Sequence, residues 1–259
     1  IIATGSSPFE LPGFEADGVQ VLNSDHLLDI TEVPKRLLIV GGGVIGVELA
    51  SIFSAFGSAV TIIEALPSII ANEEESIRVE LAKSLKSHGA AIYTGVKAEG
   101  LVKSGAGVAV TLSTGEKIEA DKALIAVGRK INSENLGLEA CGVNVERGKI
   151  LVDAKMRTNV RNIYAIGDVT GKIMLAHVAS HQAGVAVENC LGGSLEMDYG
   201  AVPNCIFTKP EIASVGLTEK SAVESGLKVK TGVFPFAGIG KAVISGDAQG
   251  FVKIVAEEA

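Results

Sequence analysis

The chain has 259 residues, 47% of them hydrophobic and 20% charged, so it is long enough for more than one globular domain and is not composed like a disordered protein. Its formal net charge of −7 argues against binding to a nucleic acid backbone or to an anionic membrane surface. The apolar stretch 37–63 contains consecutive glycines and Glu48, which favours buried parallel strands with a packed helix over a membrane span.

Residues 1–30 begin with a strand-like run that ends at Thr4, and a turn follows at Leu11-Pro12-Gly13. We interpret this segment as the tail of an earlier domain. A regular pattern starts at Lys35, where a strand, a glycine turn, an apolar helix and a second strand predict a βαβ unit. The strands are expected at 36–40 and 59–64, with the helix reaching about Phe56.

The next helix is predicted to begin after Asn72 as N-cap, with Glu75 completing a capping box, and to end at Gly89. A short strand follows, then two alternating runs that predict an antiparallel insertion with one solvated face, and a closing buried strand. These elements are expected at 91–94, 108–112, 117–120 and 122–127.

Residues 130–198 contain a predicted strand at 163–166, a turn at Gly167-Asp168 and a helix from about Leu175 to Cys190. We interpret this part as a return to the first domain. After Tyr199 the pattern changes to short strands, a helix near 218–225 and an alternating strand at 251–255, which predicts the beginning of a further domain.

Gly41, Gly43 and Gly46 form a G-x-G-x-x-G pattern between an apolar strand and an apolar helix. The first glycine allows a tight turn, the second lets the main chain approach a pyrophosphate, and the third lets helix and strand pack closely. Glu64 ends the next strand, where an acid binds an adenosine ribose and its charge favours NAD over NADP. The alternatives are glycines that only pack a turn and a solvated acid at a strand end.

Two further acids stand in apolar surroundings. Glu48 is either a structural hydrogen-bond acceptor or a contact to a polar group of a ligand, and both interpretations stay open. Asp168 follows a buried strand, where it can accept hydrogen bonds from sugar hydroxyls or cap the next segment as a turn residue.

The sequence predicts no metal site and no disulfide framework. His177 and His181 are four residues apart on one helix, but no acid or cysteine completes a ligand set. The three cysteines, Cys141, Cys190 and Cys205, are widely spaced, so we expect small core residues in a reducing, cytoplasmic compartment.

Several motifs occur in an order that resembles one family. They are Ile1-Ile2-Ala3-Thr4-Gly5-Ser6, the glycine pattern with Glu48, Ala126-Val127-Gly128-Arg129, Ile166-Gly167-Asp168-Val169 and Met174-Leu175-Ala176-His177. The chain resembles the class I pyridine nucleotide-disulfide oxidoreductases, and within them the dihydrolipoamide dehydrogenases, over nearly its whole length. The implied fold is α/β: a Rossmann-like three-layer NAD domain inserted in an incomplete FAD domain, with the start of an α+β interface domain.

The resemblance also implies domain ranges and cofactor contacts. The ranges are 1–32 for part of the FAD domain, 33–130 for the NAD domain, 131–198 for the return of the FAD domain, and 199–259 for a truncated interface (dimerisation) domain. The implied NAD contacts are Gly41, Gly42, Gly43, Val44, Ile45, Gly46, Val47, Glu48, Glu64, Val96 and Gly128. The implied FAD contacts are Thr4, Gly5, Ser6, Asp168, Met174, Leu175, Ala176 and His177, with Asp168 on the ribityl chain.

Some motifs of the family pattern are expected outside this chain, and one position within it differs. The glycine fingerprint for FAD and the Cys-x4-Cys redox pair are expected before Ile1, the His-Glu acid-base motif is expected after Ala259, and Ile131 stands where many relatives have proline. We therefore assign no catalytic residue to this chain, and expect the fragment by itself to bind NAD weakly and to be inactive toward dihydrolipoamide.

In the family, a dithiol reduces a redox-active disulfide, and electrons pass through FAD to NAD. The resemblance thus implies a flavoprotein oxidoreductase that acts on dihydrolipoamide or a lipoyl domain, as a homodimer within a 2-oxoacid dehydrogenase or glycine cleavage complex. Two alternatives remain. One is another NAD-linked disulfide reductase, of the mercuric or coenzyme A disulfide type, and the other is a noncatalytic NAD-binding module.

Overall fold

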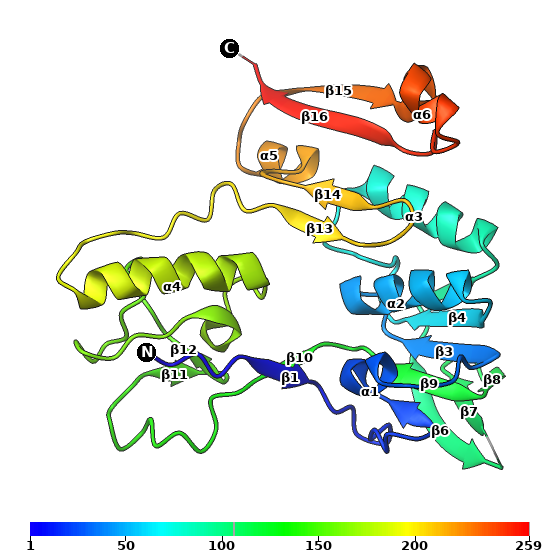
Figure 1. Cartoon of the computed structure of the whole chain (residues 1–259), viewed down its shortest axis with the longest axis horizontal. Helices are drawn as coiled ribbons and strands as arrows, with labels where there is room; N and C mark the ends of the chain where they lie inside the picture. The colour runs from blue at the N-terminus through cyan, green and yellow to red at the C-terminus, as the bar shows by residue number, and fades with distance from the viewer. Residues whose placement is uncertain (106, 259) are drawn as a thin grey trace. The chain divides into compact units, whose positions relative to one another are not determined.

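The computed structural model describes residues 1–105 and 107–258, and Ala106 and Ala259 lie outside the described residues. The chain divides into two compact units, each assembled from separate stretches of sequence (Figure 1). Unit 1 comprises Ile1–Phe9 and Arg129–Val202, and unit 2 comprises Glu10–Gly128 and the segment from Pro203 onward.

A five-stranded parallel sheet forms the centre of unit 2. Its strands, in spatial order, are β2 (Val21–Leu22), β9 (Lys122–Ile125), β3 (Arg36–Val40), β4 (Ala59–Glu64) and β5 (Ala91–Thr94). Helices α2 (Val44–Ala55) and α3 (Glu75–Ser87) make the crossovers from β3 to β4 and from β4 to β5. Because β9 lies on the other side of β3, the strand order reverses between β3 and β9, where open α/β sheets bind ligands.

Alternate residues of β3 point to opposite faces of this sheet, as the two-residue period of a strand requires. Leu37 and Ile39 belong to a buried cluster with residues of α2 and α3. Leu38 and Val40 belong to a second cluster with a three-stranded antiparallel sheet. That sheet is β6 (Ala98–Ser104), β7 (Gly107–Leu112) and β8 (Lys117–Ala120). The three layers confirm the predicted Rossmann-like fold (Figure 1).

Burial on both faces also explains why the stretch 37–63 is so apolar. Among the described residues, no helix combines the length and the hydropathy needed to cross a membrane.

Unit 1 is built around one long helix, α4 (Ala176–Cys190), which packs on the 3-10 helix η1 (Gly167–Thr170). Two short antiparallel ladders complete it. Strand β1 (Ser6–Pro8) pairs with β10 (Arg129–Ile131), and β11 (Val145–Glu146) pairs with β12 (Lys149–Ile150). Its buried residues include Met156, Tyr164 and Val185.

The remaining elements of unit 2 lie outside the parallel sheet, its two helices and the three-stranded sheet. They are α1 (Ser24–Leu28), β13 (Asn204–Ile206), β14 (Ile212–Ser214), α5 (Glu219–Glu224), β15 (Val229–Pro235), η2 (Phe236–Gly238), α6 (Gly240–Ile244) and β16 (Phe251–Glu257).

Lys253 of β16 donates hydrogen bonds to Glu219 at 2.6 Å and to Glu74 at 2.8 Å. These two carboxylates raise the pKa of Lys253, and they tie β16 to α5 and to the start of α3.

Several predicted elements need correction. Helix α3 is capped by Glu74, whose side chain makes no capping hydrogen bond, so the predicted Asn72 cap and its capping box are wrong. The expected strand 163–166 makes only isolated bridges, from Ala165 to Ile2 and from Tyr164 to Arg157. Parallel strands need continuous neighbours, and among the described residues this segment has none on either side.

The predictions for the cysteines and for some element ends were also wrong. Cys141, Cys190 and Cys205 are all exposed rather than in the core. Cys190 is the last residue of α4, and Cys205 lies in a two-stranded ladder that leaves one face uncovered. The closing strand of the parallel sheet ends at Ile125 rather than Val127, and β6 and α1 were not predicted.

The compact units divide the chain near residue 9, because β2 joins the parallel sheet beside β9. The domain ranges expected from the family remain a proposal about the intact protein.

Asp17 holds the segment that leads into β2. One carboxylate oxygen accepts the amides of Val19, Gln20 and Val21 at 2.8–2.9 Å, and the other lies 2.6 Å from Lys103 Nζ of β6. Burial raises the pKa of Asp17, but the hydrogen bonds from Lys103 and from these amides outweigh it and hold the pKa far below its usual range.

Asp17→Asn is expected to lower the free energy of unfolding by about 1–2 kcal/mol at neutral pH, because it replaces charge-assisted hydrogen bonds by neutral ones. The depressed folded-state pKa means that this contribution is complete above the unfolded-state pKa of about 4 and is lost as the pH falls through the folded value. Urea unfolding of both proteins between pH 7 and pH 2 measures the difference, with the exposed Glu10→Gln as control. A difference that grows on acidification would contradict the prediction.

Candidate functional site

The turn between β3 and α2 lies at the carboxyl edge of the parallel sheet, and two of its glycines are required by the protein's own backbone. Gly41 has φ +109°, and a Cβ built on it would lie 2.3 Å from the carbonyl oxygen of Ala126, just after β9. A Cβ on Gly46 would lie 2.0 Å from the carbonyl oxygen of Gly41. The predicted roles of these residues in a tight turn and in close helix-strand packing agree with this geometry.

Gly43 differs from its neighbours. Its backbone, at φ −72° and ψ −176°, is extended and open to any residue, and a Cβ built on it meets no atom of the described chain within 4 Å. The fold therefore gives no reason for glycine at this position. A ligand that comes close to the main chain does give one, because a methyl group would occupy its place.

The N-terminus of α2 is suited to an anion. The helix starts at Val44, and within the described part of the chain no side chain caps the amides of its first turn, which also contains no acidic residue. Unpaired amides and the helix dipole together favour a phosphate or carboxylate at this end.

Glu64, the last residue of β4, lies beside this turn. Its Oε2 accepts the amide of Gly42 at 2.6 Å, and its Oε1 accepts the amide of Leu66 at 2.7 Å. An ionised carboxylate has room for about four hydrogen bonds, so two hydroxyl donors can still be accommodated. Its negative charge opposes a ligand phosphate at the same place.

The other residues predicted to contact NAD lie in the same unit. Val96 follows β5, and its amide donates to the Glu64 carbonyl at 3.1 Å. Gly128 follows β9 with φ +142°. Glu48 accepts the amide of Phe207 at 2.8 Å, so one of its oxygens serves as a structural acceptor and its remaining lone pairs stay available for a ligand contact. The structure thus gathers the turn, Glu64, Val96 and Gly128 along the carboxyl edge of one sheet.

The residues predicted to contact FAD gather in unit 1. Ser6 donates its hydroxyl to Asp168 Oδ2 at 2.5 Å, and Asp168 lies in the first turn of η1. Thr4 Oγ1 donates to the carbonyl of Asn132 at 2.5 Å, and the Gly5 carbonyl accepts the Asn132 amide at 3.0 Å. Residues 1–6 are thereby joined to η1 and to the chain after β10.

The Met174-Leu175-Ala176-His177 run leads into α4. Leu175 is the extended N-cap of the helix and Ala176 its first residue, and the Met174 side chain is 39% exposed. Gln182 of α4 accepts the Gly167 amide at 2.6 Å, which holds η1 against the helix. The run and Asp168 therefore belong to one packed substructure.

Two residues in these sites were not predicted. Arg129 donates through Nε to Ser6 Oγ at 2.6 Å and through Nη2 to the Ser6 carbonyl at 2.8 Å, so it holds the hydroxyl that contacts Asp168. The sequence signal that could have identified Arg129 is its position directly after a predicted strand and Gly128. Ile70 donates its amide to the Gly42 carbonyl at 2.8 Å, and an apolar loop residue gives no sequence signal for such a contact.

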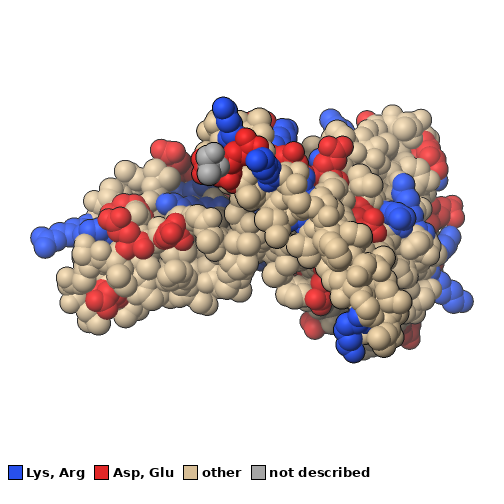
Figure 2. All heavy atoms as spheres, turned by 90° about the horizontal axis from the view of Figure 1, so that it is seen from above, with Lys and Arg blue, Asp and Glu red and all other residues tan. Residues whose placement is uncertain are grey.

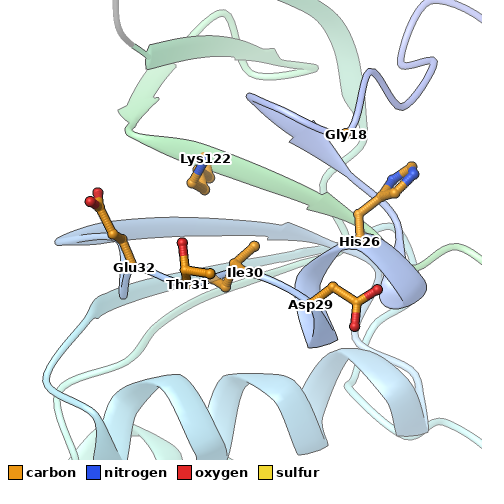
Figure 3. Close-up of a pocket in the computed structure, with 7 residues that line it drawn as sticks. All are labelled: Gly18, His26, Asp29, Ile30, Thr31, Glu32 and Lys122. Atoms are coloured by element: carbon orange, nitrogen blue, oxygen red, sulfur yellow. The ribbon is translucent and has the colours of Figure 1, made fainter.

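A cavity of about 330 Å³ in unit 2 is lined by Gly18, His26, Asp29, Ile30, Thr31, Glu32 and Lys122 (Figure 3). Lys122 begins β9 and residues 29–32 precede β3, so the cavity lies toward the amino ends of these strands and apart from the glycine turn. It contains none of the predicted site residues.

Among residues 1–105 and 107–258, no group of three or more His, Cys, Asp or Glu is arranged to hold a metal ion. On the face shown in Figure 2, Lys and Arg are interspersed with Asp and Glu, unlike the basic stripe of a nucleic-acid-binding domain.

Comparison with protein families gives two matches. Residues 1–183 match the family model described as pyridine nucleotide-disulphide oxidoreductase, and residues 202–259 match the dimerisation domain of the same proteins.

Curated relatives and solved structures agree with these matches. Dihydrolipoyl dehydrogenase of Chlamydia muridarum is 46% identical over 261 residues, covering 100% of this chain and 56% of the relative, and that of Bacillus subtilis is 45% identical, covering 99% and 56%. The chain thus spans little more than half the length of these relatives. The structure of LpdA from Mycobacterium tuberculosis matches with a TM-score of 0.93 and 32% identity, covering 99% of this chain and 56% of that one. The flavoprotein disulfide reductase RclA from Escherichia coli matches with a TM-score of 0.90 and 33% identity, covering 98% and 59%.

The glycines of the turn are expected to differ in what they contribute to stability. Gly46→Ala should lower the free energy of unfolding by at least about 2 kcal/mol, because its methyl group collides with a backbone carbonyl that cannot move freely. Gly43→Ala should change it by less than about 1 kcal/mol, since the backbone conformation suits alanine. Thermal and urea unfolding of both variants measure the contrast, and equal destabilisation by the two would contradict it.

Proposed function

The chain belongs to the pyridine nucleotide-disulphide oxidoreductase family, and from this premise we propose that unit 2 binds NAD in a flavoprotein oxidoreductase of the dihydrolipoyl dehydrogenase kind. The observation that carries the proposal is the space next to Gly43, where an added Cβ would meet no described atom. This space adjoins the uncapped amides of α2 and the Glu64 carboxylate, which the Gly42 amide holds in place. A dinucleotide needs all three: close approach to the main chain, an anion site and an acceptor for hydroxyls.

In this proposal the pyrophosphate lies against Gly43 and the first turn of α2, while Glu64 accepts the hydroxyls of the adenosine ribose. Val96 and Gly128 border the same edge of the sheet. Glu64 selects NAD, because a 2′-phosphate would stand beside its charge. Glu48 holds the Phe207 amide through one oxygen, and its remaining lone pairs can accept a polar group of NAD.

Unit 1 supplies the proposed FAD contacts, which are Thr4, Gly5, Ser6, Asp168 and 174–177. When bound, FAD accepts electrons from a thiol pair and passes a hydride to NAD. The chain's own contribution is to hold Asp168 as an acceptor for sugar hydroxyls. Because Arg129 donates to the Ser6 oxygen, the Ser6 proton is directed to Asp168, which keeps that carboxylate an acceptor on its remaining lone pairs.

For the whole protein, we propose oxidation of dihydrolipoamide or a lipoyl domain by NAD, by a cytoplasmic homodimer that serves a 2-oxoacid dehydrogenase or glycine cleavage complex. The curated relatives named dihydrolipoyl dehydrogenase, 42–46% identical over nearly the whole chain, support this substrate. The match of residues 202–259 to a dimerisation domain supports the homodimer.

Glu64→Ala is expected to weaken NADH binding by about 1–3 kcal/mol, the free energy of one or two charge-assisted hydrogen bonds, and to reduce the preference for NADH over NADPH. Isothermal titration of the chain with NADH and NADPH measures both affinities. The matched control is Glu99→Ala, an exposed acid of the same unit. If the unmodified chain bound NADPH more tightly than NADH, the role of Glu64 would be wrong.

Asp168→Asn in the full-length protein is expected to lower the fraction of protein that retains FAD and to leave the pH dependence of turnover unchanged, because the residue holds sugar hydroxyls rather than transferring protons. Flavin absorbance relative to protein absorbance gives the occupancy, and Asp198→Asn is the control in the same unit. Full occupancy combined with a shifted pH profile would instead identify Asp168 as an acid-base residue.

A further inference from the structure

The loop that connects β4 to α3 runs beside the glycine turn and is anchored by two isoleucines. Ile69 and Ile70 are 1% and 4% exposed, and both belong to the buried cluster that joins α2 and α3 to the parallel sheet. A connecting loop with consecutive buried β-branched residues is unusual, since loops commonly run over the surface. These two side chains fix the course of the loop next to the site.

Ile70 adopts a backbone conformation that β-branched residues rarely adopt. Its φ is +40°, in the left-handed region, where a branched Cβ crowds the backbone. In this conformation its amide donates to the Gly42 carbonyl at 2.8 Å, and its carbonyl accepts the amide of Glu73 at 2.9 Å. Burial of the side chain holds the backbone there, and the backbone in turn directs the amide at the glycine turn.

Gly42 is consequently held from two sides. Glu64 accepts its amide at 2.6 Å, and Ile70 donates to its carbonyl. A Cβ built on Gly42 would lie 2.7 Å from Cγ2 of Ile69 and 3.1 Å from Cβ of Glu64. The glycine at position 42 is therefore required by Ile69, a residue of this chain, whereas the glycine at position 43 meets no described atom.

We propose that Ile69 and Ile70 are positioning residues of the nucleotide site. Ile70 fixes the orientation of the Gly42 carbonyl, and Ile69 excludes any side chain at position 42. Together with Glu64 they set the direction in which Gly43 and the first amides of α2 face the ligand. The inference rests on the proposed binding of NAD by unit 2, and it assigns Gly42 to the loop contact rather than to the ligand.

A double-mutant cycle tests the role of Ile69 in the chain as it stands, with NADH titrated by calorimetry and unfolding followed in parallel. Gly42→Ala should weaken NADH binding at least about tenfold, because the new methyl group pushes against Ile69 and turns the loop. Ile69→Ala alone should lower the unfolding temperature and weaken NADH binding by about twofold to threefold, because the loop beside Gly42 loses one of its two buried anchors. The double variant should regain an affinity within about threefold of Ile69→Ala, despite its lower stability. Rescue of affinity without rescue of stability is an outcome that a purely structural role would not produce.

The role of Ile70 is tested by a matched pair of variants, and this test is valid even if the Gly42→Ala variant does not fold. Ile70→Ala and Ile70→Gly both remove most of the buried side chain, but only glycine adopts the left-handed conformation readily. Ile70→Gly should therefore bind NADH at least about threefold more tightly than Ile70→Ala. Equal affinities of these two variants, or a double variant that binds as poorly as Gly42→Ala, would overturn the inference. Failure of the unmodified chain to bind NADH would instead overturn the proposed function, so the two failures are distinguishable.

Discussion

The close packing of main chain on main chain at the start of α2 is the constraint on which the site depends. The carbonyl of Gly41 lies where a side chain at position 46 would have to begin, and position 41 itself faces the carbonyl of Ala126. Backbone atoms that approach this closely leave no room for side chains, so the end of β3, the first turn of α2 and the end of β9 are fixed relative to one another. Whatever binds in front of α2 meets a rigid surface made of amides.

The selectivity proposed for that surface depends on a residue distant in sequence. Glu64 is brought to the turn by the parallel pairing of β4 with β3, and it is held by two amides rather than left to rotate in solvent. Unit 1 follows the same principle, because Arg129 and Ser6 fix the carboxylate of Asp168. In both units a carboxylate that we propose to accept ligand hydroxyl groups is ordered by donors of the protein, which lowers the entropy that a ligand must remove on binding.

Most of the parallel-sheet unit was predictable from sequence because its signals are local. Strands β3, β4 and β5 and helices α2 and α3 were predicted from apolar runs and helical spacing, and the glycine pattern predicted a candidate site between them. The predictions failed where structure depends on distant partners. The two residues of β2 are a strand only because β9 pairs with them, residues 163–166 lack such neighbours, and the exposure of Cys205 depends on what covers its ladder. The hydrogen bond of Ile70 to Gly42 is equally invisible in sequence, because it arises from backbone direction and not from residue type.

The pairing of β1 with β10 has a consequence for the order of folding. Ser6 lies opposite Ile131 and Pro8 opposite Arg129, so the first ladder of unit 1 closes a loop of more than a hundred residues. Closing so long a loop through unfolded chain is entropically costly. Within the inserted segment, the pairings of β3 with β4 and of β4 with β5 are shorter in sequence, and the long-range pairing of β9 with β3 and β2 then brings the two ends of the segment together. Once that segment has folded with its ends close together, the effective loop is short. Folding of the inserted parallel sheet thus lowers the entropic cost of pairing β1 with β10 in unit 1. Slow folding of that sheet would delay the formation of unit 1.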